Sequence, residues 1–219
     1  MRIPTLKVTL HRSQFGTGLM RAALSLGLAA WPMSGVIAAD AAHAHHHHAM
    51  PDKPDSFVRT QVAYTVPDVK LLDVNGARVS LRSELAEQDR PVILNFIYTS
   101  CTAICPVMSA TFSQVQATLG PQRNAVRMVS ISIDPEQDTP PVLKAYADKF
   151  DAGPQWRMLT GSLPDSIAVQ RAFNVYRGDK MGHTPATFLR AKAGQPWVRL
   201  DGFASANDIL QEYRQLAAR

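Results

Sequence analysis

The two cysteines of the 219-residue chain, Cys101 and Cys105, lie in the segment TSCTAICPVM and are separated by three residues. A continuous apolar run, PVILNFIY at residues 91–98, precedes them, and Pro106 suits the first turn of a following helix. We therefore expect both thiols at a helix N-terminus, where free amide groups and the helix dipole lower thiol pKa values. Thiolate is the form that attacks disulfides and binds metals.

Residues four apart share one face of a helix, so two sulfurs placed there can hold one ion or close a disulfide after a local adjustment. Two thiolates do not complete a zinc site, whereas soft thiolates select Cu(I), and one added imidazole also suits Cu(II). His183 is the only histidine after residue 48. From the residues alone it is a copper ligand or, more commonly for a lone histidine, a structural residue. Two unreactive buried thiols are the other alternative for the cysteines.

Strand and helix signals alternate from Tyr64 onward, and Asn75-Gly76 between two apolar runs predicts a hairpin over residues 71–81. Further strands are expected at residues 91–98, 126–133, 156–159, 187–190 and 198–200, and helices at residues 110–119, 139–150, 162–173 and 205–217. This order predicts an α/β chain with a thioredoxin-like fold: a central mixed sheet flanked by helices, plus an N-terminal β-hairpin.

Three of the expected helices begin at residues that favour an N-cap. Thr139 precedes Pro140, which fits where the backbone N–H has no partner anyway. Ser162 and Ser205 are each followed three residues later by an aspartate, the spacing typical of a capping box.

The positive net charge of +5 comes mainly from residues 1–39, which hold four basic residues and no acid. The remainder carries 19 Lys and Arg against 18 Asp and Glu, without a basic stripe for nucleic acid. Residues 1–39 also contain an apolar run followed by small residues, which indicates a cleaved signal peptide or a retained membrane anchor. Either form predicts export, to a bacterial periplasm, where the cysteines can form a disulfide.

The composition of residues 40–60 predicts a flexible linker that is rich in histidine, with His43 and the run from His45 to His48. The run is an accidental bias of a spacer or a site that gathers metal ions. We place the folded domain at residues 61–219.

Three motifs taken together resemble the Sco (SenC/PrrC) family: YTSCTAICPVM after an apolar strand, SISIDPEQDTP, and a later histidine that enters a strand. The resemblance covers residues 64–217 and implies a thioredoxin-like copper protein, periplasmic or tethered to the membrane. It further implies assistance in assembling the binuclear copper site of cytochrome c oxidase subunit II or of another exported cuproprotein. By the same resemblance, Cys101, Cys105 and His183 are the copper ligands.

The acidic motif of the family matches Asp134 and Asp138. Asp134 ends a strand and is expected beside the ligands without binding copper itself, whereas Asp138 is expected to support the turn before Thr139. The chain departs from the family at Gly182, where members commonly carry aspartate, and at Pro185. A proline there is what thioredoxins use, in the cis form, beside their reactive cysteines.

Two functions from different classes follow. The first is a copper-binding assembly factor that uses the two thiolates and His183. Gly182, Pro185 and the soft sulfur of Met181 nearby favour the second function instead. The second is a thiol–disulfide oxidoreductase in which Cys101, the more exposed thiol, attacks and Cys105 resolves the mixed disulfide. A weaker third reading is a metal scavenger dominated by the histidine tract. A peroxidase is not favoured, because no arginine flanks the cysteine loop.

Overall fold

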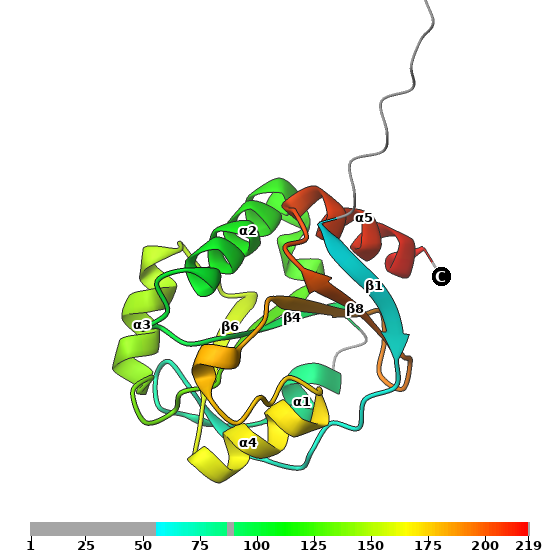
Figure 1. Cartoon of the computed structure of the whole chain (residues 1–219). Helices are drawn as coiled ribbons and strands as arrows, with labels where there is room; N and C mark the ends of the chain where they lie inside the picture. The colour runs from blue at the N-terminus through cyan, green and yellow to red at the C-terminus, as the bar shows by residue number, and fades with distance from the viewer. Residues whose placement is uncertain (1–55, 87–89, 219) are drawn as a thin grey trace, which may run out of the picture. The chain divides into compact units, whose positions relative to one another are not determined.

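The computed structural model describes residues 56–86 and 90–218, and Figure 1 shows their course. Eight strands form one sheet: β1 (Phe57–Val62), β2 (Lys70–Asp73), β3 (Arg78–Ser80), β4 (Val92–Ile97), β5 (Arg127–Ser132), β6 (Trp156–Thr160), β7 (Ala186–Arg190) and β8 (Trp197–Gly202). The helices are α1 (Leu81–Ala86), α2 (Ile104–Leu119), α3 (Pro140–Lys149), α4 (Leu163–Ala172) and α5 (Ala206–Ala217), with 3-10 turns η1 (Gly120–Ala125) and η2 (Lys180–Gly182).

The sheet has the order β1-β8-β7-β4-β5-β6-β2-β3. The pairs β4–β5 and β5–β6 are parallel, because α2 and α3 return the chain across the sheet between these strands. The remaining pairs are antiparallel. The predicted mixed sheet flanked by helices is therefore confirmed.

Strand β4 lies in the interior of this sheet, and all six of its residues are buried. Figure 1 shows α2 and α5 on one side of the sheet and α1 and α4 on the other. A strand covered on both faces must be apolar on both, which is why VILNFI shows no alternation. The cysteine segment leaves from the C-terminal end of this strand, so its starting point is fixed by the centre of the core.

The expected strands and helices from residue 70 onward are present; most of their ends shift by a few residues, and α2 begins at Ile104, six residues before its expected start. The hairpin at Asn75-Gly76 is confirmed: β2 and β3 pair from Lys70 with Ser80, and Gly76 has a φ of 77°. The carboxylate of Asp73 accepts hydrogen bonds from two backbone amides of the turn, at 2.9 and 3.0 Å.

The three helices begin at the predicted N-cap residues, and two of these residues also form the side-chain hydrogen bond. The side chains of Ser162 and Ser205 each accept the amide three residues later, and Ser205 forms a full capping box. Thr139 occupies the N-cap position of α3 as predicted, but its side chain makes no capping hydrogen bond. Pro140 stands at the first helical position as expected.

Strand β1 and helix α1 were not anticipated from the sequence. Residues 57–60, which the sequence places in the linker, lie in β1, which pairs with β8 over six positions. Its middle four residues are exposed, as suits an edge strand, and Arg59 forms an ion pair with Glu212 of α5 at 2.7 Å. The proposed boundaries at residues 39 and 40 lie outside the described residues.

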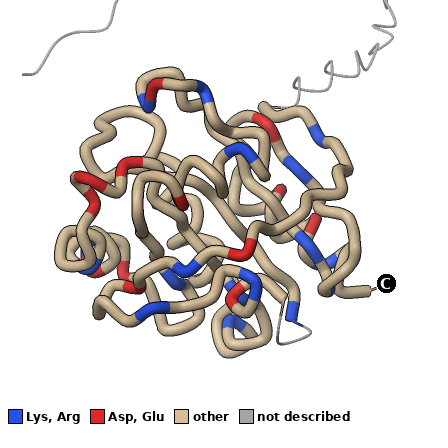
Figure 2. The backbone as a smooth tube through the Cα atoms, turned by 90° about the horizontal axis from the view of Figure 1, so that it is seen from below, with Lys and Arg blue, Asp and Glu red and all other residues tan. Residues whose placement is uncertain are grey.

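Lysine, arginine, aspartate and glutamate are interspersed along the described chain, as Figure 2 shows. Within these residues, no helix has both the length and the apolar character needed to cross a membrane. The predicted leader at residues 1–39 is outside this part of the chain.

The core on one side of the sheet is organised around Phe173, which is fully buried. Its ring centroid lies 5.2 Å from Tyr64, 5.7 Å from Phe96, 5.4 Å from Phe188 and 5.3 Å from Trp197. Tilted and edge-on aromatic pairs of this kind add to the free energy gained by burial. Through Phe96 the cluster reaches the strand that carries the cysteine segment.

We expect Phe173→Ala to lower the free energy of unfolding by about 3–5 kcal/mol, because the truncation leaves a cavity among four rings. Chemical denaturation of the purified protein measures this loss. The control is Phe203→Ala, whose side chain is 44% exposed and whose loss should cost much less. Equal effects of the two substitutions would contradict the assignment of Phe173 as a core residue.

Candidate metal and redox site

The two cysteines occupy different kinds of backbone. Cys105 is the second residue of α2 and is fully buried, whereas Cys101 lies in the loop between β4 and α2 and is partly exposed. The expectation that both sulfurs share one helix face is therefore wrong, because Cys101 is not helical. The loop instead folds back so that the amide of Cys105 donates a hydrogen bond to the Cys101 sulfur at 3.4 Å. Both thiols are free.

The end of β4 supplies the next hydrogen bonds of the loop. The amide of Tyr98 donates to the sulfur of Cys105 at 3.4 Å, and the amide of Cys101 donates to the carbonyl of Tyr98 at 3.2 Å. The hydroxyl of Tyr98 also favours the thiolate form of Cys101. Each sulfur thus accepts a backbone amide within one short loop, which fixes the pair close together.

The environment makes the two thiols unequal. Burial opposes ionisation of Cys101, but hydrogen bonds from the amides of Cys105 and Ala103 and from Tyr98 outweigh it and lower its pKa. Burial raises the pKa of Cys105 to about 12, and the nearby Cys101 adds to this effect. Burial, with the Cys101 hydrogen bond, also raises the pKa of Tyr98 to about 12, so this hydroxyl stays protonated and can donate. Cys101 is therefore the thiol that ionises first.

Asp138 holds the cysteine loop from the side of β5. Its carboxylate is fully buried and accepts hydrogen bonds from the Thr99 amide at 3.1 Å, the Thr99 hydroxyl at 2.6 Å and the Ser132 hydroxyl at 2.6 Å. The predicted role of Asp138, support of the turn before Thr139, is incomplete. Its amide does belong to that turn, where it bonds the Asp134 carbonyl, but its side chain anchors the loop that carries Cys101.

Asp134 acts on a different segment, which we call the histidine loop and define as residues 179–185. Its carboxylate forms an ion pair with Lys180 at 2.5 Å, and Lys180 begins the 3-10 turn η2 that leads to His183. The amide of His183 closes this turn on the carbonyl of Lys180 at 3.1 Å. Asp134 therefore supports the loop that carries His183.

His183 is 7% exposed and lies against the strand that precedes the cysteines. Its Nε2 is 3.2 Å from the carbonyl oxygen of Phe96, so Nε2 carries the proton and donates. Nδ1 is buried and has no hydrogen-bond partner, although it carries a free lone pair in this tautomer. Burial lowers the pKa of His183, with a further decrease from Arg177, so the ring is neutral at pH 7.

The structure brings the three predicted ligands to the same strand end without closing them into one site. His183 contacts the backbone of Phe96, and Cys105 contacts the backbone of Tyr98 two residues later. Among the described residues, no three His, Cys, Asp or Glu side chains are arranged to hold a metal ion in this conformation. The orphaned Nδ1 and the thiols nevertheless have the donor chemistry that copper requires.

Tyr98 is the functional residue that reasoning from the sequence missed. Its hydroxyl donates to the sulfur of Met181 at 3.9 Å and favours the thiolate form of Cys101, and its ring lies edge-on to His183 at 6.5 Å between centroids. The signal in the sequence is a tyrosine that directly follows a buried strand and precedes the cysteine loop. The bond before Pro185 is trans, so the thioredoxin feature named above is not found here.

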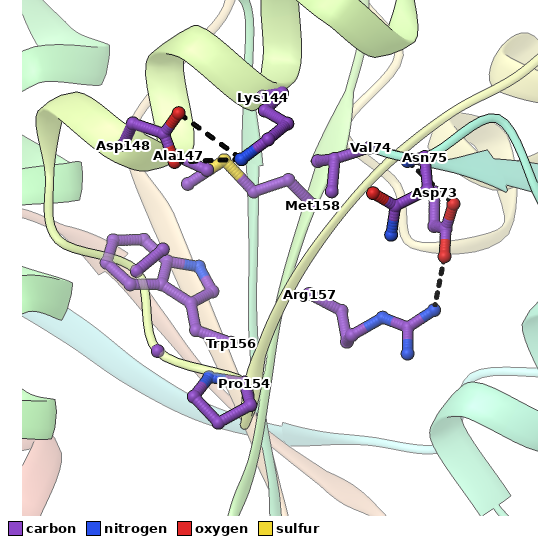
Figure 3. Close-up of a pocket in the computed structure, with 12 residues that line it drawn as sticks. Asp73, Val74, Asn75, Lys144, Ala147, Asp148, Pro154, Trp156, Arg157 and Met158 are labelled. Atoms are coloured by element: carbon purple, nitrogen blue, oxygen red, sulfur yellow. Dashed lines mark hydrogen bonds and ion pairs between the residues drawn. The ribbon is translucent and has the colours of Figure 1, made fainter.

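Among the surface pockets of the described residues, two differ in how near they lie to these loops. One, of about 270 Å³, lies between α3 and the strands β2 and β6, and Figure 3 shows its paired charges, Arg157 with Asp73 and Lys144 with Asp148. None of its lining residues belongs to the cysteine or histidine loops. The other, of about 500 Å³, is lined in part by Asp134 and Lys180 and so adjoins the histidine loop.

Comparison with known proteins gives a family match over nearly all of the described chain. The SCO1/SenC family model matches residues 59–218. The SCO1 protein homolog of Bacillus subtilis is 33% identical over 105 residues, which are 48% of this chain and 53% of that protein. The chain spans about half the length of the first curated relatives that it matches.

Solved structures agree with this match. ScoI of Bradyrhizobium japonicum with copper bound superposes with a TM-score of 0.58 and 26% identity, covering 69% of this chain and 99% of that one. BsSco, described as a Sco-family cytochrome c oxidase assembly protein with a disulfide switch, gives a TM-score of 0.61 and 26% identity over 74% and 98% of the two chains. The predicted thioredoxin-like fold is thereby confirmed.

The different environments of the thiols predict selective alkylation. In the reduced protein, iodoacetamide should modify Cys101 at least about tenfold faster than Cys105, because only Cys101 is both accessible and readily ionised. The alkylation rate of Cys101 should rise with pH, and the midpoint of this rise should lie below the pKa of an ordinary thiol. Peptide mass spectrometry after timed quenching measures both rates, with Cys101→Ala and Cys105→Ala to assign them. Comparable rates at the two positions would contradict the asymmetry described above.

Proposed function

The chain belongs to the SCO1/SenC family, and on this premise we propose that it is an exported copper-binding assembly factor whose ligands are Cys101, Cys105 and His183. Copper is the cargo of such a protein. Two thiolates suit Cu(I), and an added imidazole extends the site to Cu(II). Three protein ligands leave the ion open to an incoming ligand from a partner, as transfer requires.

The observation that carries the proposal is the unpartnered Nδ1 of His183. A buried nitrogen with a free lone pair and no hydrogen-bond donor loses the solvation it had in water, which is unfavourable unless a ligand compensates it. The opposite nitrogen is held by the Phe96 carbonyl, which fixes the tautomer as partners of metal-binding histidines commonly do. The ring is thus prepared to bind a metal through Nδ1.

The two aspartates would keep both ligand loops close while the ion is bound or released. Asp138 fixes the start of the cysteine loop at Thr99, and Asp134 fixes the histidine loop at Lys180. Both carboxylates come from the segment after β5, so one segment connects the two loops. Closing the ligand set then requires local movement of the loops and of Tyr98, without any change in the sheet.

The partner proposed for this factor is cytochrome c oxidase subunit II or another exported cuproprotein. The choice of partner rests on the family membership of this chain and on BsSco, which is described as a member of the Sco family of cytochrome c oxidase assembly proteins. We place the folded domain in the periplasm, either released by signal cleavage or held at the inner membrane by residues 1–39, as the sequence of this segment indicates.

Copper titration tests the proposed ligand set. The reduced protein should bind one Cu(I) and, separately, one Cu(II), and His183→Ala should weaken Cu(II) binding by at least about tenfold. The measurement is anaerobic competition against a chromophoric chelator. All variants should carry serine in place of His43 and His45 to His48, so that the histidine tract adds no copper. Thr184→Ala is a matched control beside His183.

Either of two results would remove this proposal: no tight copper at one equivalent, or an affinity indifferent to His183→Ala. If copper binding is lost only when the histidine tract is replaced, the metal-scavenger reading is supported in its place.

A second function, thiol–disulfide reduction, is favoured by the asymmetry of the cysteine pair. Cys101 is accessible and has a lowered pKa, whereas Cys105 is buried beside it with a raised pKa. In this reaction the Cys101 thiolate attacks a target disulfide and releases one target thiol. Cys105 then attacks the Cys101 sulfur, which releases the second target thiol and leaves a Cys101–Cys105 disulfide.

A trapping experiment distinguishes this function from a purely metal-binding one. Cys105→Ser should leave a stable mixed disulfide between Cys101 and a target that carries an exposed disulfide, because the resolving thiol is gone. Non-reducing electrophoresis with an oxidised peptide model of a cuproprotein copper site detects the adduct. Cys101→Ser should give none. A Cys101–Cys105 pair whose disulfide has a very low potential and exchanges with no target would exclude the reductase.

A further inference from the structure

We propose that Met181 is an additional Cu(I) ligand, which supplies a thioether to the ion beside the Cys101 sulfur. The inference deepens the function proposed above and rests on it, because it concerns the same copper site. It adds a donor outside the three ligands, and one that distinguishes the two oxidation states of copper.

The exposure of Met181 is the first observation. Its side chain is 75% exposed, the highest value among the large apolar side chains that the described part of the chain presents to solvent. Methionine usually fills gaps in cores, and burial of this side chain would be favourable. Packing therefore does not account for a methionine at this position, two residues before the candidate ligand His183.

Backbone anchoring of Met181 is the second observation. Its amide donates to the Asp179 carboxylate at 2.9 Å, and its neighbour Lys180 is held by Asp134. The Cα of Met181 is thus fixed on a short 3-10 turn while its three-bond side chain extends into solvent. A fixed base with a flexible soft donor suits capture of an ion and delivery to a deeper site.

The third observation joins Met181 to the cysteine loop. The Tyr98 hydroxyl donates to the Sδ atom of Met181 at 3.9 Å, and the Tyr98 carbonyl accepts the amide of Cys101 at 3.2 Å. Tyr98 therefore connects a thioether from the histidine loop with the backbone of the cysteine loop. Rotation of the exposed methionine side chain, together with displacement of the Tyr98 hydroxyl, would let the sulfurs of Met181 and Cys101 contact one ion.

The chemistry of the donors specifies the oxidation state. A thioether is a soft, uncharged ligand that favours Cu(I), whereas Cu(II) gains little from a weak thioether and prefers imidazole. Met181 and His183 thus divide the two states between them: Met181 adds affinity for Cu(I), and His183 adds it mainly for Cu(II). Both side chains belong to one turn, so the histidine loop presents either donor to the thiolates with small movements.

The test uses the full chain labelled with [13C-methyl]methionine and titrated anaerobically with Cu(I) under chelator competition. One equivalent of Cu(I) should shift the Met181 methyl resonance, which is assigned by its loss in Met181→Leu. The same substitution, close in volume, should weaken Cu(I) binding by about tenfold and change Cu(II) binding by less than about twofold. Val107→Leu, at another exposed apolar position near the cysteines, should change neither affinity.

The outcomes separate this inference from the function on which it rests. Tight Cu(I) binding with an unmoved Met181 methyl resonance and an unchanged affinity in Met181→Leu would overturn the inference and leave the copper proposal intact. Failure of the unsubstituted chain to bind copper would overturn the copper proposal, and the inference with it. If Met181→Leu folds poorly, Met181→Gln supplies the assignment of the resonance, and the shift in the unsubstituted chain decides the matter.

Discussion

The backbone at the end of β4 is the constraint on which both ligand loops depend. The carbonyl of Phe96 accepts the His183 ring, and the amide of Tyr98 donates to the Cys105 sulfur. Because β4 is buried on both faces and paired on both edges, these backbone groups occupy fixed positions. Cys105 and His183, which lie far apart in sequence, are thereby positioned by one rigid strand.

Buried carboxylates extend this constraint to the loops. Asp138 lies below the solvent-exposed surface and uses both oxygens on the cysteine loop and on β5, whereas Asp134 makes a partly exposed ion pair with the histidine loop. A hydrogen-bonded buried carboxylate holds its partners more firmly than an exposed ion pair, which solvent screens. The cysteine loop is therefore the firmer half of the site, and the histidine loop is the half that can adjust.

The elements that the sequence predicts correctly are those with a strong local pattern: the apolar run of β4, the Asn75-Gly76 turn and the serine caps of α4 and α5. Strand β1 was missed because an exposed edge strand, here FVRTQV, has little apolar alternation. The cysteines, His183 and the acidic motif could be singled out by residue type and spacing. Tyr98 and the separate tasks of the two aspartates could not, because they depend on loops distant in sequence that meet only after folding.

The two sulfur atoms of the cysteine loop also accept hydrogen bonds from main-chain amides, so a chemical change at either sulfur affects the backbone around it. A sulfur that forms a disulfide, or that gives its electron pair to an ion, becomes a poorer acceptor for the amides of Tyr98 and Cys105. Disulfide formation, or the binding of an ion by these sulfurs, would therefore weaken the hydrogen bonds of peptide groups at the end of β4 and at the start of α2.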